Sequence, residues 1–142
     1  MTITLVAVAA AIINVKAETH TVHFFNNCNF GTPYLRNETG DVLSTGQDYT
    51  INGPLVGAIA YLQTGNCGDN GENCTLLQTT LLNGASVTDI SLIPPHAFSV
   101  PTGFGYYNGC DDEGGDCTSP DDCDVQVSCQ ADNVDLAITF CD

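Results

Sequence analysis

The chain has 142 residues, 17 Asp and Glu against 2 Lys and Arg, and a formal net charge of −15. This length excludes a large multidomain enzyme. The charge excludes the usual electrostatic nucleic-acid binder and disfavours anionic membranes, because almost no cations are available to neutralise phosphates. Hydrophobic residues make up 43% and charged residues 13% of the chain, which is typical of a globular protein and not of a disordered acidic tail.

Residues 1–17 have the features of a secretory signal peptide. The apolar run Ile3–Ile13 is shorter than the roughly 20 residues that span a bilayer, and Val15-Lys16-Ala17 places a small residue before a cleavage point. A buried N-terminal helix is the alternative. Cleavage after Ala17 would leave residues 18–142 as a secreted protein, extracellular or in a cell wall, with Arg36 as its one Lys or Arg.

Short strands and turns are predicted along the rest of the chain. Apolar residues alternate with polar ones at the period of two that half-buried strands show. On this basis strands are predicted over His20–Asn26, Tyr49–Asn52, Val56–Leu62, Val87–Leu92, Asp124–Cys129 and Val134–Cys141. Asn-Gly pairs at 52–53, 83–84 and 108–109 mark turns, because both residues tolerate positive φ. The pattern favours one all-β domain, an antiparallel β-sandwich or barrel, over residues 18–142.

One segment is open to two interpretations. Thr75–Leu82 carries four leucines, which could form a strand or one face of a short helix that ends at Asn83-Gly84.

The cysteines predict an oxidising compartment. All eight lie after the signal peptide, at positions 28, 67, 74, 110, 117, 123, 129 and 141. An even number of cysteines behind a signal peptide indicates four disulfides, although about 105 pairings are possible. Zinc is disfavoured, because the shortest gaps, Cys117 to Cys123 and Cys123 to Cys129, are longer than the usual zinc-ligand spacing.

Two sequons predict N-glycosylation, which also fits export. Asn37-Glu38-Thr39 lies in a polar, turn-like stretch and is the better acceptor. Asn73-Cys74-Thr75 contains a cysteine whose oxidation would compete with glycan transfer.

An acidic segment follows Cys110. It contains seven carboxylates, namely Asp111, Asp112, Glu113, Asp116, Asp121, Asp122 and Asp124. So many like charges must be solvated or bound to a cation. Asp111, Asp112, Glu113 and Asp116 are candidate calcium ligands, since calcium prefers oxygen donors, but the EF-hand spacing is absent. A solvated loop held by disulfides is therefore the favoured interpretation, and no cofactor is predicted.

The run Phe104-Gly105-Tyr106-Tyr107 has two interpretations. Aromatic rings beside glycines could form a platform on which sugar rings stack, which makes Phe104, Tyr106 and Tyr107 candidate glycan-binding residues. Alternatively, Phe104 and Tyr106 alternate into the core while Tyr107 covers a disulfide.

The histidines carry no catalytic signal. His20 and His23 are three apart, so on a strand they would face opposite ways and could not share a metal. His96 follows two prolines and is expected in a loop, and no G-x-S-x-G motif accompanies it.

The order of motifs resembles the thaumatin-like (PR-5, osmotin-type) family. The matching segments are Val22–Cys28, Gly40–Gln47, Gly57–Cys67, Asp89-Ile90-Ser91-Leu92 with Phe98-Ser99-Val100-Pro101, and Ile138-Thr139-Phe140-Cys141. The chain resembles a small member that lacks most of the family's second, disulfide-rich domain. The resemblance implies a β-sandwich with the disulfides Cys28–Cys141 and Cys110–Cys129, which leaves Cys67–Cys74 and Cys117–Cys123.

The resemblance also implies a function. Larger relatives have an acidic cleft associated with β-1,3-glucan binding and, in some, weak endo-β-1,3-glucanase activity. Asp89 falls on the cleft Asp, whereas the cleft Arg falls at Leu62 or Gln63 and the cleft Glu at Asn83. Ordinary glycoside hydrolysis needs two carboxylates, and only one is recognisable.

The expected function is therefore that of a secreted, non-catalytic monomer that binds β-glucan or another cell-wall or surface glycan, in a defence or host-interaction role. One alternative is an endo-β-1,3-glucanase that uses Asp89 with a second acid from residues 111–124. Another is an acidic interaction module or effector that binds a basic protein. Nucleic acid and membranes are not expected partners.

Overall fold

The computed structural model describes residues 17–142, so the predicted signal peptide lies outside the described residues except for Ala17. Within this part no helix has the length and apolarity needed to cross a membrane. The chain forms eleven strands: β1 (His20–Asn26), β2 (Thr32–Arg36), β3 (Val42–Ser44), β4 (Tyr49–Ile51), β5 (Leu55–Gln63), β6 (Leu76–Leu81), β7 (Ser86–Ser91), β8 (Thr102–Tyr107), β9 (Gly114–Cys117), β10 (Val125–Cys129) and β11 (Asp135–Phe140).

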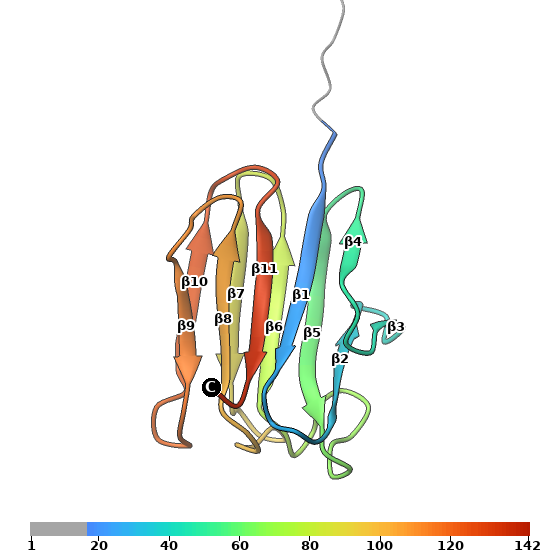
Figure 1. The fold of residues 1–142 in the computed structure, drawn as a ribbon, viewed down its shortest axis with the longest axis vertical. Helices are drawn as coiled ribbons and strands as arrows, with labels where there is room; N and C mark the ends of the chain where they lie inside the picture. The colour runs from blue at the N-terminus through green and yellow to red at the C-terminus, as the bar shows by residue number, and fades with distance from the viewer. Residues whose placement is uncertain (1–16) are drawn as a thin grey trace, which may run out of the picture.

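These strands form two sheets that face each other (Figure 1). One sheet has the order β4-β1-β11-β8-β9 and the other the order β10-β7-β6-β5-β2-β3. The predicted all-β sandwich is confirmed.

The first and last strands are paired in parallel, unlike the other strand pairs of the described chain, which are antiparallel. Val22 lies opposite Leu136 and Phe24 opposite Ile138. This pair is the one parallel exception among the described strand pairs of the expected antiparallel sandwich. Because parallel strands end at the same edge of a sheet, Cys28 and Cys141 come together there with Cα atoms 5.0 Å apart, and they form a disulfide.

The core lies between the sheets and follows from strand alternation. In β1, Val22 and Phe24 are buried and face inward, at the alternating positions expected of a half-buried strand. Phe140 of β11 is fully buried and stacks on Phe24, with ring centroids 6.4 Å apart. Leu136 and Ile138 are also fully buried. Each such side chain contributes about 1.5–3 kcal/mol relative to an exposed position.

The ambiguous segment Thr75–Leu82 is a strand, β6, and not a helix. Leu77, Thr79 and Leu81 of β6 are buried at every second position, the period of a strand that packs one face on the core.

Four strands were not identified by alternation. β8 and β9 contain glycines, which interrupt the apolar pattern and suggest turns, and β9 lies inside the acidic segment expected as a loop. β3 is only three residues long. β2 contains Pro33, which lacks an amide hydrogen but is tolerated because β3 pairs only with Leu35 and Arg36.

The remaining disulfides are Cys67–Cys74, Cys110–Cys129 and Cys117–Cys123. Together with Cys28–Cys141 these are the pairs that the resemblance implied. Cys110 follows β8 of one sheet and Cys129 ends β10 of the other, so this bond connects the two layers.

The bond between Cys28 and Cys141 should stabilise the fold more than the short-loop bonds do. It spans 113 residues of sequence. Replacing both cysteines with serine should lower the free energy of unfolding by about 4–5 kcal/mol, the chain-entropy value for a loop on the order of 100 residues. Replacing Cys67 and Cys74, which are 7 residues apart, with serine should lower the free energy of unfolding by less, about 3 kcal/mol or below. Urea unfolding of both variants measures the difference, and equal losses would contradict the prediction.

Candidate functional site

The predicted aromatic platform is not formed by Phe104 and Tyr106. These side chains are only 6% and 3% exposed and belong to the core. The Tyr106 hydroxyl lies 2.9 Å from the Val127 carbonyl oxygen and 3.0 Å from Thr88 Oγ1, inside the sandwich. Their ring faces are therefore closed to a glycan, and the core interpretation applies to both.

Tyr107 lies on the opposite face of β8 and is half-buried. Burial, followed by the negative charges of Asp135 and Asp48, raises the pKa of its hydroxyl. It remains neutral at physiological pH and lies apart from the hollows around Asp89 described below.

Asp89 lies on the outer face of the six-stranded sheet, in β7, next to the edge strand β10. It is half-buried in β7, where Thr88 and Ile90 on either side face the core. Strand register places Gln78 of β6 opposite it on one side and Gln126 of β10 opposite it on the other. Partial burial raises the pKa of the Asp89 carboxyl, because desolvation disfavours its charged form.

Two hollows adjoin Asp89. The larger, of about 520 Å³, lies on the β10 side, and its polar lining residues are Asp89, Ser91, Asp121, Asp124 and Gln126. The smaller, of about 250 Å³, lies on the β5 side and is lined by Gly57, Ala58, Ile59, Gln78, Thr79, Thr80, Val87 and Asp89. Asp89 is the one residue that lines both.

Asn83 does not take the cleft position that the resemblance assigned to it. It lies after β6, where its backbone N–H donates to Glu18 Oε1 at 2.7 Å and its Oδ1 accepts from the Asn133 N–H at 2.7 Å. It lines neither hollow. The residue beside Asp89 on β6 is Gln78, so an amide lies where a second carboxylate was sought.

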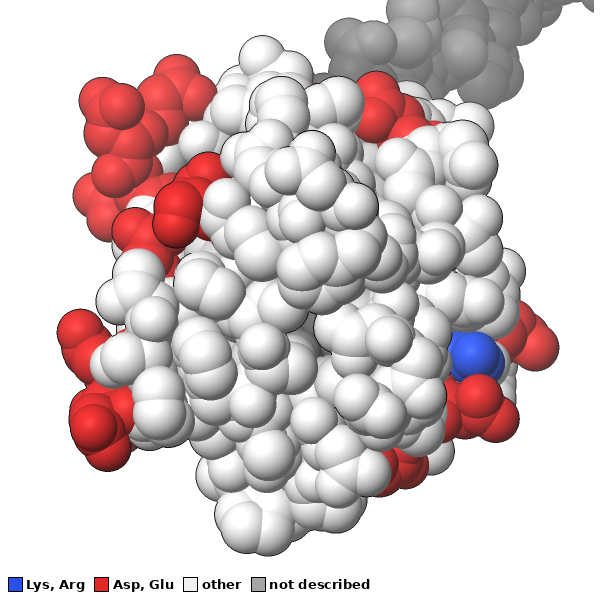
Figure 2. Space-filling view, turned by 60° about the horizontal axis from the view of Figure 1, so that its bottom comes forward, with Lys and Arg blue, Asp and Glu red and all other residues white. Residues whose placement is uncertain are grey.

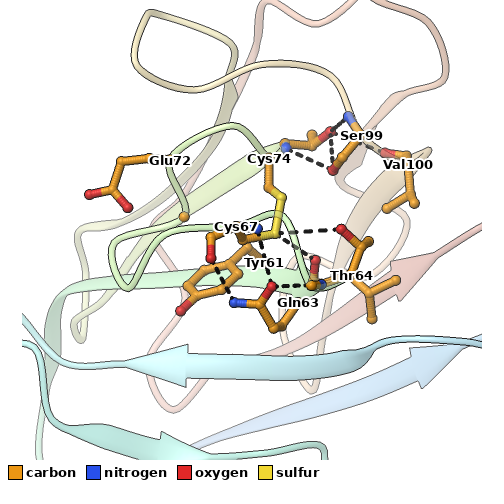
Figure 3. The surroundings of a disulfide bond; sticks show 12 residues. Tyr61, Gln63, Thr64, Cys67, Glu72, Cys74, Ser99 and Val100 are labelled. Carbon is orange, nitrogen blue, oxygen red and sulfur yellow. Dashed lines mark hydrogen bonds between the residues drawn. A yellow bond between two sulfur atoms is a disulfide. The ribbon is translucent and has the colours of Figure 1, made fainter.

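Leu62 and Gln63, the positions matched to the cleft Arg, have structural roles. Leu62 is 1% exposed. The Gln63 side chain donates from Nε2 to the Cys67 carbonyl at 2.9 Å and accepts at Oε1 from the Gly65 and Cys67 N–H groups, which fixes the loop of the Cys67–Cys74 disulfide (Figure 3).

Arg36, the one Lys or Arg in residues 17–142, also has protein partners. Its Nε donates to the Tyr61 hydroxyl and its Nη1 to the Gly40 carbonyl, at 3.1 and 2.8 Å.

The acidic segment divides into two parts. Asp121 and Asp124 line the larger hollow together with Asp89. Asp112, Glu113 and Asp116 instead line a separate shallow hollow beside β8 and β9. In Figure 2 the acids form separate groups around the margin of the visible face.

No metal centre is formed in the described part of the chain, where no three His, Cys, Asp or Glu side chains lie close enough to hold an ion. Asp111, Asp112, Glu113 and Asp116 form no such cluster in this structure, and calcium binding by them stays a prediction. His20 and His23 face opposite sides of β1, as predicted: His20 is buried, and His23 is bonded to Asp48 at the surface.

The two sequons differ in accessibility. Asn37 and the exposed Thr39 lie in the turn between β2 and β3, where the Thr39 hydroxyl donates to Asn37 Oδ1 at 2.9 Å. In the second sequon Asn73 is exposed, but Thr75 is 1% exposed and donates to the Val100 carbonyl at 3.2 Å. Glycosylation at either remains a prediction.

Asp89→Asn should make the protein slightly more stable at neutral pH. Because the pKa of Asp89 is raised in the folded protein, the protonated carboxyl is the form that favours folding. This stabilisation is complete below the pKa that Asp89 has in the unfolded chain, and it is lost as the pH rises through the pKa of the folded protein. The expected gain is at most about 0.5 kcal/mol, because solvent screens a partly exposed group. Chemical unfolding at neutral pH and below about pH 3 measures it. A loss of stability at neutral pH would instead indicate that the protein stabilises the Asp89 charge.

Comparisons with known proteins identify the fold. No protein-family model matches the sequence, and no curated protein matches it. Among solved structures, that of the thaumatin-like xylanase inhibitor TLXI is similar, with a TM-score of 0.60 and 20% sequence identity over 87% of this chain and 99% of that chain. At this identity the similarity establishes architecture. The chain has a thaumatin-like fold, as the order of its sequence motifs predicted.

Proposed function

We propose that the chain is a secreted, non-catalytic thaumatin-like protein that binds β-glucan or another uncharged cell-wall glycan through Asp89 and its neighbours. The observation that carries the proposal is the row Gln78, Asp89 and Gln126, which lies across three adjacent strands. A carboxylate accepts hydrogen bonds from sugar hydroxyls, and an amide both donates and accepts. Strands hold such groups more rigidly than loops do, which suits recognition of a polyhydroxylated ligand.

The charge of the surface favours an uncharged glycan. The sequence carries 17 acids, and Arg36 is the one Lys or Arg after the predicted cleavage point. An anionic polysaccharide would be repelled on approach, whereas a neutral glycan approaches without that cost.

The same row supports binding without hydrolysis. Glycoside hydrolases ordinarily need two carboxyl groups, one as an acid and one as a base or nucleophile. Both register neighbours of Asp89 are amides, which perform neither role.

Export is part of the proposal. Four disulfides are typical of proteins that fold in an oxidising compartment. Glu18 accepts from the Asn83 N–H, and the Thr19 N–H donates to Asn133 Oδ1 at 3.0 Å. A mature chain that starts at Glu18 would retain both contacts.

Co-sedimentation with insoluble β-1,3-glucan tests the proposal. The wild-type protein should be retained, and Asp89→Asn should weaken retention about tenfold or more, because hydrogen bonds to a charged group contribute roughly 1.5–3 kcal/mol. Asp132→Asn is the matched control, since Asp132 is exposed in a turn and lines neither hollow. If the wild type binds no wall polysaccharide, or if both variants behave alike, the assignment of Asp89 fails.

An endo-β-1,3-glucanase is a second candidate that one observation favours. Asp121 and Asp124 line the same hollow as Asp89, whose pKa is raised, as is required of a general acid. The same samples distinguish the two functions. Release of reducing ends from laminarin by the wild type, lost in Asp89→Asn, would establish hydrolysis, whereas retention without release supports a binding protein.

A protein partner is the remaining alternative. The structurally similar protein is a thaumatin-like xylanase inhibitor, and the acidic surface of this chain would attract a basic enzyme. If a basic xylanase is the partner, its association rate should fall about tenfold or more between low and physiological salt. Surface plasmon resonance with a basic and an acidic xylanase measures this. A salt-independent complex would exclude electrostatic docking.

A further inference from the structure

The outer face of the six-stranded sheet carries a row of side chains perpendicular to its strands. β10, β7, β6 and β5 lie side by side in the sheet (Figure 1). Strand register places Gln126 opposite Asp89, Asp89 opposite Gln78, and Gln78 opposite Ile59. The row crosses three strand spacings, roughly 14 Å. Gln126 lines only the larger hollow, whereas Gln78 and Ile59 line only the smaller one, so the row runs through both hollows.

The disulfide loop between β5 and β6 covers the neighbouring row. Tyr61 and Leu76 lie on the same outer face but are fully buried, at 0% and 1% exposed. A Cβ added at Gly71 of the loop would come within 2.8 Å of Leu76 and 3.1 Å of Tyr61, so the loop backbone packs directly on these two residues. The row of Ile59, Gln78 and Asp89 is thus the first uncovered row beside the loop.

On the β5 side the smaller hollow has few charged groups. Its exposed surface comes from Gly57, Ile59, Gln78, Thr80 and Val87. The Thr80 hydroxyl already accepts a hydrogen bond from the Gly57 N–H at 3.0 Å. The Gln78 amide is therefore the more available of these two polar groups for a ligand. The apolar side chains suit the C–H face of a sugar, and the amide suits its hydroxyls. The β10 side instead offers the carboxylates of Asp121 and Asp124.

We propose that the two hollows form one trough that holds a linear, uncharged glycan across the strands, with sugar sites on both sides of Asp89. This inference rests on the proposed glycan binding and adds to it the direction of the bound chain and its dependence on length. The larger hollow holds the shortest ligands. Longer chains also contact Gln78 and Ile59.

Titration calorimetry with laminari-oligosaccharides of increasing length tests the trough. Wild-type affinity should rise with length and then level off once the row is filled. Gln78→Ala should weaken binding of the long oligosaccharides about two- to tenfold, the range for one neutral hydrogen bond, and leave the disaccharide unaffected. Asp89→Asn should weaken binding of all lengths.

The matched control is Ser128→Ala, which removes an exposed side chain of the same outer face that lines neither hollow. Thermal unfolding midpoints verify that each variant is folded. If affinity does not depend on length and Gln78→Ala has no effect, the trough is overturned while glycan binding at Asp89 stands. If no oligosaccharide binds to the wild type, both the trough and the proposed function fail.

Discussion

The parallel pairing of the first and last strands is the constraint on which the rest of the architecture depends. β1 and β11 are separated by nearly the whole described chain yet are central neighbours in the five-stranded sheet. Their inward side chains, among them Phe24 and Phe140, fill the middle of the core. Because both strands run the same way, Cys28 and Cys141 meet at one edge, and a single covalent bond closes the domain. Hydrophobic burial and the disulfide therefore stabilise the same long-range contact.

The candidate site is a consequence of register in the other sheet. Thr88 and Ile90 must face the core, so Asp89 between them must face outward. Antiparallel pairing then places Gln78 and Gln126 beside it, although they lie far away in sequence. A slip of one residue in β7 would bury Asp89 and expose Ile90, at a cost in both desolvation and apolar burial. The packing of the core therefore fixes the geometry of the surface row.

Much of the fold was predictable from local pattern, whereas Asp89 alone of the candidate site was predicted from the sequence. Alternation in β1 and β11 located both strands within a residue or two, and the motif order indicated the thaumatin-like architecture. β8 and β9 were missed because glycine interrupts alternation without breaking a strand. Matching by motif placed the cleft Glu position at Asn83, whereas strand register places Gln78, and not Asn83, beside Asp89. Which residues share a row depends on long-range pairing, and no single segment encodes it.

Partial burial of Asp89 links the stability of the protein to the proposed glycan binding. The Asp89 carboxylate is partly desolvated in the free protein. Sugar hydroxyls that bind to it would therefore displace fewer water molecules, and the desolvation cost of binding would be smaller. The same burial makes the free protein less stable than it would be with an uncharged residue at this position. Gln78 and Gln126 flank the carboxylate without adding charge, so they supply hydrogen bonds while avoiding the repulsion that a second acid would introduce. An amide on each side of one acid is therefore better suited to holding a neutral glycan than to cleaving it.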